Sequence, residues 1–190
     1  MTFQIVVLGT RGKNTIAKLA EFLKTKNSKL MIKKIIANKE DEFFFSARKV
    51  FHGTKLVKNS NYSSRKKFEQ ALLKEIGKVD LVLLLHFSRR LTNFFLKEIG
   101  CPVVNLHPSL LPKHSKLFYY KVFESVLHAH EKVSGVTLHL VDAELDHGKI
   151  LMQKKFKLSK KENLESLIRK TEKVEFELLK NFLNSGISQL

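Results

Sequence analysis

Residues 3–14 read FQIVVLGTRGKN and join a short apolar run to a glycine-bearing turn. The run from Phe3 to Leu8 has the length and continuous apolar character of a strand that is buried on both faces of a parallel sheet. After the turn at Gly9–Asn14, apolar residues recur at helical spacing through residues 15–25. The chain therefore opens with a strand–turn–helix unit, the repeating element of an α/β fold.

The same alternation continues along the chain. The apolar patterns predict further strands at 30–37, 55–57, 80–86, 103–106, 135–141 and 149–156. They predict further helices at 42–50, 64–76, 92–99, 118–130 and 164–183, with Ser63 or Ser64 as the cap of the second of these. We therefore expect one α/β domain over residues 1–190, with a doubly wound, mostly parallel sheet and helices on both faces. In such folds the ligand lies at the carboxyl ends of the strands.

Composition excludes several classes of protein. The chain has 190 residues, of which 43% are hydrophobic and 28% charged, which suits one domain with a real core. A single cysteine, Cys101, excludes an internal disulfide and a four-cysteine zinc site. The sequence lacks both an apolar run near the ~18 residues of a membrane span and a basic leader. We expect a cytoplasmic protein that does not bind membranes.

The charge is strongly positive, with 35 Lys and Arg against 18 Asp and Glu. Residues 101–150 carry five of each sign, so the excess is absent from the segment in which the candidate motifs are densest. Aromatic residues do not interleave with the lysines as they do in single-strand binders. We interpret the excess as a solvated, lysine-rich surface, which would also attract a phosphate-bearing substrate. Nucleic acid is not the expected partner.

Three loops carry candidate chemistry, and the first is the turn at Gly9–Asn14. A turn that leads from a strand into a helix presents backbone N–H groups to an anion. Only two residues separate Gly9 from Gly12, so the turn is not a Walker A loop. Phosphate binding and an ordinary turn both remain open for these residues.

The second loop begins with Asn105-Leu106-His107 at the end of a predicted strand and continues into Pro-Ser-Leu-Leu-Pro. Because side chains alternate along a strand, Asn105 and His107 fall on the same face. An amide donor beside an imidazole suits an oxyanion site with a proton shuttle. A purely structural role is the alternative.

The third loop, residues 142–148, offers three carboxylates and the imidazole of His147. One carboxylate would orient or deprotonate His107 if this loop packs against the second one. The carboxylates would alternatively hold a metal ion, or form an exposed acidic turn.

Together, residues 105–112 (NLHPSLLP), 135–139 (GVTLH) and 142–148 (DAELDHG) resemble the folate-dependent formyltransferases, most closely those that act on glycinamide ribonucleotide. The resemblance implies a Rossmann-like fold and an enzyme of purine biosynthesis. Such an enzyme moves a formyl group from its co-substrate 10-formyltetrahydrofolate to the amine of the ribonucleotide, without a metal. It implies that Asn105 binds the formyl oxygen, that His107 stabilises or protonates the intermediate, and that Asp146 holds His107 and moves the amine proton.

The resemblance also implies the binding residues. Its phosphate-binding residues are Gly12, Lys13, Asn14 and Arg65. His139 would lie beside the substrate, and the folate would contact Arg89, Arg90, Leu91, Val141 and Asp142. The implied partners are small molecules, and the chain would act as a monomer or a homodimer.

Three positions depart from the family pattern. Lys13 replaces a small hydroxyl residue, while His86 and Lys116 each stand where the family has glycine. Lys13 would either strengthen phosphate binding or crowd it, and Lys116 changes the expected backbone path of its loop. His86 affects the fit of the acceptor more than the chemistry. Alternatives are therefore a formyltransferase that acts on an amino-sugar nucleotide or on methionyl-tRNA, a degenerate enzyme that binds folate without turnover, and a non-catalytic nucleic-acid-binding domain.

Overall fold

The computed structural model describes residues 2–25, 29–187 and 190. The chain divides into two compact units, Met1–Val104 and Asn105–Leu190. The expectation of one domain over residues 1–190 stays a prediction.

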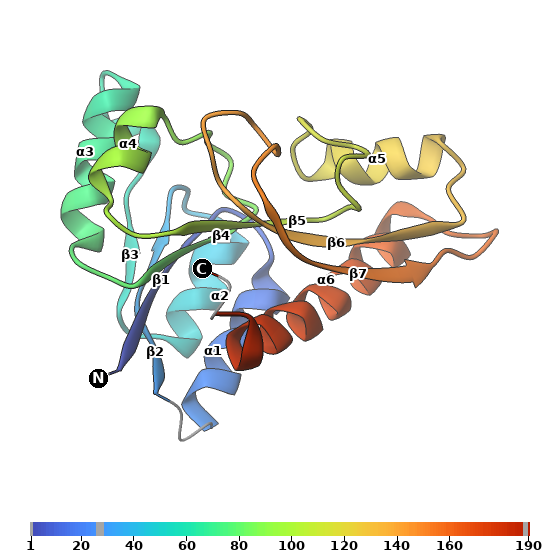
Figure 1. Cartoon of the computed structure of the whole chain (residues 1–190), viewed down its shortest axis with the longest axis horizontal. Coiled ribbons are helices and arrows are strands. Elements are labelled where there is room, and N and C mark those ends of the chain that lie inside the picture. The colour runs from blue at the N-terminus through green and yellow to red at the C-terminus, as the bar shows by residue number, and fades with distance from the viewer. Residues whose placement is uncertain (1, 26–28, 188–189) are drawn as a thin grey trace. The chain divides into compact units, whose positions relative to one another are not determined.

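The first unit contains four parallel strands with helices between them (Figure 1). The strands are β1 (Phe3–Gly9), β2 (Leu30–Ala37), β3 (Thr54–Leu56) and β4 (Leu81–Leu85), in the order β3-β2-β1-β4. The helices are α1 (Lys13–Thr25), α2 (Glu42–Val50), α3 (Arg65–Ile76) and α4 (Asn93–Glu98). Helix α1 packs on α2 and α3 packs on α4, and Figure 1 shows the two pairs on opposite sides of these strands.

Local sequence explains these elements. All five residues of β4 are buried, as a continuous apolar run requires in a strand that is covered on both faces. The side chain of Asp41 accepts from the N–H groups of Phe43 and Phe44 and caps α2. Ser64 caps α3 by accepting from the N–H of Lys67.

The second unit contains the remaining strands and two helices. Strand β5 (Val103–His107) has its first two residues in the first unit and its last three in the second. The order is β5-β6-β7, and β6 (Val133–Leu140) runs antiparallel to β7 (Ile150–Lys157). Helix α5 (Tyr120–His128) packs on α6 (Leu164–Asn181), which also packs on β6 and β7 and ends in a π-turn at Phe182–Gly186. Phe123, Val126 and Leu167 are the buried centre of the α5–α6 contact.

The predicted α/β fold, with a mostly parallel sheet and helices on both faces, is confirmed. All the predicted strands and helices are present, and their ends differ by a few residues. Helix α5 begins at Tyr120, not at Phe118, because Tyr119 has a φ of 35°, outside the right-handed helical region. Helix α1 begins at Lys13 because the N–H of Ile16 already bonds to the carbonyl of Gly12. The short 3-10 helix at Asn59–Asn61 was not predicted.

Among the described residues, we find no helix that is both long enough and apolar enough to cross a membrane.

Candidate active site

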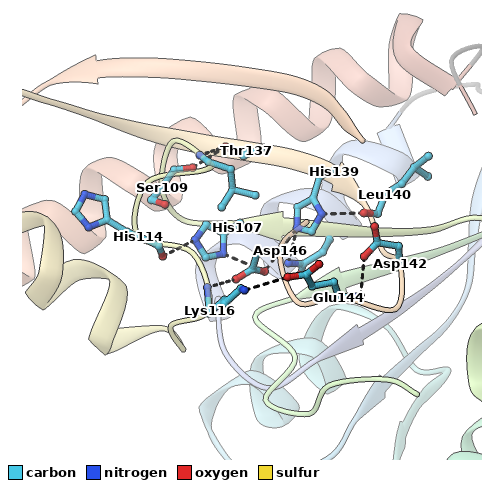
Figure 2. A network of polar contacts seen from close by, with 12 residues as sticks. His107, Ser109, His114, Lys116, Thr137, His139, Leu140, Asp142, Glu144 and Asp146 are labelled. Carbon is cyan, nitrogen blue, oxygen red and sulfur yellow. Dashed lines mark hydrogen bonds and ion pairs between the residues drawn. The ribbon is translucent and has the colours of Figure 1, made fainter. Parts of the chain in front are cut away.

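The end of β5 and the loop after β6 bring an imidazole and a carboxylate together. His107 is the last residue of β5, and its Nδ1 lies 3.6 Å from Oδ1 of Asp146 (Figure 2). Both side chains are only 4% exposed. Little water reaches the two facing atoms, and the contact is an ion pair only when the imidazole is charged. The sequence analysis expected one carboxylate of residues 142–148 to face His107, and Asp146 is the one that does.

Asn105 and His139 form a second contact beside this pair. The Nδ2 atom of Asn105 lies 3.1 Å from Nε2 of His139, while Nδ1 of His139 lies 2.8 Å from the carbonyl oxygen of Leu140. A carbonyl only accepts, so the proton of His139 is on Nδ1. Nε2 therefore accepts from the amide of Asn105. The amide nitrogen of Asn105 keeps a second N–H for another acceptor.

Burial favours the neutral form of His139. Its desolvation lowers the pKa of the imidazole, against the opposing influence of the Leu140 carbonyl and of Asp146 and Asp142. Oδ1 of Asp146 is 3.8 Å from Nε2 of His139, so this carboxylate faces both imidazoles. A neutral His139 is the form that accepts from Asn105.

The loop that carries Asp146 is held as a compact turn. Oδ1 of Asp142 accepts from the N–H of Glu144 at 2.9 Å, and its Oδ2 lies 3.1 Å from Nδ1 of His147. This carboxylate raises the pKa of the exposed His147. Asp146 itself has a φ of 56°. At Gly148 a Cβ would lie 1.9 Å from the carbonyl oxygen of Leu140, so only glycine lets the chain return so close to β6.

Hydrogen bonds from Thr137 and Gln153 hold the segment that follows His107, although the sequence analysis gave neither residue a role. The hydroxyl of Thr137 donates to the carbonyl of Ser109 at 2.7 Å and accepts from the N–H of Leu111 at 3.0 Å. The side-chain N–H of Gln153 also donates to this hydroxyl and to the carbonyl of Leu111. Thr137 stands inside the predicted motif 135–139, whereas Gln153 carried no sequence signal.

In the first unit, the predicted phosphate loop lies at the start of α1. Gly12 has a φ of 85°, and its carbonyl accepts the first hydrogen bond of the helix. Nζ of Lys13 lies 2.9 Å from Oε2 of Glu42 at the start of α2. Asn14 follows in the first turn of α1. The start of a helix is a place where anions bind, and this turn also carries the cation of Lys13.

His86 packs against the same loop. It has a φ of 47°, and its Cδ2 atom would lie 3.0 Å from a Cβ placed on Gly12. The left-handed backbone explains why a glycine would be favoured at position 86.

A cavity of about 260 Å³ in the first unit brings together three arginines that sequence analysis had assigned to different ligands. Arg65, Arg89 and Arg90 line it, together with the rings of Tyr62 and Phe68. Guanidinium groups recognise carboxylates and phosphates, and the rings supply an apolar wall. Leu91 is buried beside this segment and is 3% exposed. Val141 and Asp142 belong to the second unit and follow β6 directly.

An amide, an imidazole and a carboxylate that meet in a buried place can bind an oxyanion and move a proton. Such a set can support the transfer of a group by attack at a carbonyl carbon. Within the described part of the chain, no three His, Cys, Asp or Glu side chains are grouped to hold a metal ion.

Residues 3–183 match the formyl transferase family, so the chain belongs to this family. Members use a formyl-folate as co-substrate. The chain is 30% identical to phosphoribosylglycinamide formyltransferase of Escherichia coli (strain K12) over 154 residues, which cover 80% of this chain and 71% of the relative. It is 34% identical over 122 residues to the trifunctional purine biosynthetic protein adenosine-3 of Drosophila melanogaster, covering 63% of this chain but only 9% of that much longer protein.

Solved structures show the same fold. The crystal structure of phosphoribosylglycinamide formyltransferase from Campylobacter jejuni superposes with a TM-score of 0.83 at 28% identity. The superposition covers 96% of each chain.

Proposed function

We propose that this protein transfers the formyl group of 10-formyltetrahydrofolate to the amine of glycinamide ribonucleotide, a step of de novo purine biosynthesis. The observation that carries the proposal is the buried contact of His107 with Asp146, beside the contact of Asn105 with His139. Formyl transfer needs a hydrogen-bond donor and a proton acceptor, and these residues supply both chemical types. The names of the relatives from Escherichia coli and Campylobacter jejuni support the choice of acceptor.

In this proposal, Asn105 stabilises the charge that develops on the formyl oxygen. The amine attacks the formyl carbon, a C–N bond forms, and the carbonyl oxygen becomes an oxyanion. The Nδ2–H of Asn105 that is not bonded to His139 donates to this oxygen. Removing one such donor typically raises the barrier by about 3 kcal/mol.

His107 and Asp146 transfer the proton of the amine. After attack, the nitrogen carries a positive charge and must lose a proton, while the folate nitrogen gains one when its bond to the formyl carbon breaks. Asp146, with His107 at 3.6 Å, accepts the amine proton directly or through water and returns it to the folate nitrogen. The pair thereby moves one proton from the acceptor to the donor without being consumed.

The binding residues are proposed in two groups. Gly12, Lys13 and Asn14 bind the phosphate of the ribonucleotide, which competes with Glu42 for the ammonium of Lys13. Arg65 is proposed with them at the phosphate. Arg89 and Arg90, which line one cavity with Arg65, are proposed to bind the folate.

The remaining site residues that were predicted from the sequence are proposed to contact the folate or to act on the acceptor. Leu91, Val141 and Asp142 contact the pterin, and His139 acts on the acceptor through Asn105. The partners are small molecules. A cytoplasmic location and a monomeric or homodimeric state stay predictions.

The test is a formyl-transfer assay with 10-formyltetrahydrofolate and three acceptors in parallel: glycinamide ribonucleotide, an amino-sugar nucleotide and methionyl-tRNA. We expect turnover with the ribonucleotide alone. Asn105→Ala, purified in the same way, controls for a contaminating enzyme. Turnover with another acceptor would contradict the proposed substrate, and release of formate without an acceptor would indicate a hydrolase.

A further inference from the structure

The segment His114–Lys116 contacts both members of the His107–Asp146 pair. Nε2 of His107 lies 3.2 Å from the carbonyl oxygen of His114. Two residues later, the N–H of Lys116 donates to Oδ2 of Asp146 at 2.8 Å (Figure 2). The pair is thus held from both ends by the main chain of one short segment.

These two bonds decide which atoms of the pair face each other. A carbonyl oxygen only accepts, so Nε2 of His107 carries a proton, and Nδ1 is the atom that faces Asp146. Because Oδ2 of Asp146 is bonded to Lys116, Oδ1 is the oxygen that faces His107. The segment therefore sets the geometry through which the proposed proton transfer runs.

The backbone of this segment is unusual for its residue types. His114 has a φ of 56° and Lys116 a φ of 62°, in the left-handed region that glycine adopts most readily. Side chains that stay at such positions need support from their surroundings.

That support comes from the side chains of the two residues themselves. Nδ1 of His114 lies 2.8 Å from the hydroxyl of Ser125 on α5, and its Nε2 lies 3.7 Å from Glu131. Nζ of Lys116 lies 3.0 Å from Oε1 of Glu144, in the loop that carries Asp146. Lys116 thus joins its own segment to that loop at two points, once through its N–H and once through its ammonium group.

We propose that His114 and Lys116 are positioning residues for formyl transfer: each holds one member of the His107–Asp146 pair through its main chain, and each is held in place by its own side chain. This inference rests on the proposed function for its kinetic test. Its spectroscopic test does not depend on turnover.

The Lys116–Glu144 contact is tested by a double-mutant cycle. Lys116→Met and Glu144→Gln are each expected to lower kcat about three- to fivefold, the range that the coupling of an exposed ion pair gives, with little change in either KM. The double variant is expected to be no slower than the slower single variant. The charge swap Lys116→Glu with Glu144→Lys is expected to restore kcat to within about twofold of the wild type.

A matched control is the Lys154–Glu177 pair, which has a 2.7 Å contact in the same unit and no role in the proposed mechanism. Lys154→Met with Glu177→Gln is expected to leave kcat unchanged. Additive losses in the Lys116–Glu144 cycle, or a charge swap without recovery, would overturn the role of Lys116.

The contact between His114 and Ser125 is tested by replacing Ser125 on α5. Ser125→Ala removes the hydroxyl partner of His114 and is expected to lower kcat, whereas Ser125→Thr keeps a hydroxyl and is expected to retain it. ¹⁵N NMR of the imidazoles gives an independent readout, because it reports which nitrogen of His107 carries the proton. We expect the Nε2–H form of neutral His107 in the wild type and a mixture of forms in Ser125→Ala.

The kinetic and NMR measurements distinguish failure of the proposed function from failure of the positioning role. If the wild type transfers no formyl group but the tautomer of His107 shifts in Ser125→Ala, the positioning role stands and the proposed function fails. If His107 has the same tautomer in both proteins, the positioning role of His114 is wrong, whatever the activity.

Discussion

The Nδ2 amide nitrogen of Asn105 lies 3.1 Å from Nε2 of His139, and this contact fixes the orientation of the amide. With its proton on Nδ1, His139 offers only a lone pair at Nε2, so the NH₂ end of Asn105 must face it. The same NH₂ group is the proposed donor to the formyl oxygen. His139 thereby acts on the reaction through Asn105.

Replacing Asn105 by alanine is expected to lower kcat by about a hundredfold, because the oxyanion loses a donor that is aligned before the reaction begins. Steady-state kinetics with both substrates measures the effect. Unfolding midpoints should stay close to the wild-type value, which separates lost chemistry from lost structure. A variant that keeps near-normal kcat would remove Asn105 from the proposed role.

Asp146→Asn is also expected to lower kcat by about a hundredfold or more, since an amide cannot accept the amine proton. The side-chain oxygen can still accept from the N–H of Lys116, so the loop should keep its place. Binding of each substrate, measured by calorimetry, should change far less than kcat. Equal losses in binding and in turnover would show that Asp146 serves binding and not proton transfer.

The stability of the protein should depend on pH through His139. Burial lowers the pKa of this imidazole below its usual value of 6.5 in the folded state, so the unfolded chain binds the proton more readily. The free energy of unfolding should therefore be highest above about pH 6.5 and fall as the pH drops through that value.

His139→Gln keeps an acceptor oxygen but does not titrate. Urea unfolding between about pH 5 and pH 8 should show a weaker pH dependence for this variant than for the wild type. An equal slope in the two proteins would show that His139 is not the group responsible.

Lys13 should bind the phosphate of the acceptor in competition with Glu42. Its ammonium lies 2.9 Å from the carboxylate of Glu42, which is 78% exposed. Glu42→Gln removes the competitor and should lower KM for the ribonucleotide about two- to fivefold, without a change in kcat. Lys13→Met should raise the same KM. Two variants that both leave this KM unchanged would place the phosphate elsewhere.

The sequence predicted the elements of the fold because their signals are local. The buried run Leu81–Leu85 and the cap at Ser64 are each legible within a few residues. The start of α5 was misplaced because Phe118 and Tyr120 continue the apolar pattern across Tyr119, whose positive φ depends on its surroundings.

The motifs of the sequence predicted which residues form the candidate site, but not the contacts between them. Asn105, His107 and Asp146 were named from motifs, whereas the contacts that orient them depend on tertiary structure. The Asn105–His139 bond links residues 34 positions apart, and the Lys116–Asp146 bond links residues 30 positions apart. Likewise, only the folded chain shows that Arg65 lines one cavity with Arg89 and Arg90.

The most direct test of the account is to follow labelled formyl groups from 10-formyltetrahydrofolate with glycinamide ribonucleotide as acceptor, using the wild type and Asp146→Asn side by side. The account predicts that the wild type produces the formylated ribonucleotide, with one tetrahydrofolate released for each formyl group transferred, and that Asp146→Asn is slower by about a hundredfold or more. Equal rates in the two proteins, or tetrahydrofolate released without formylated ribonucleotide, would contradict it.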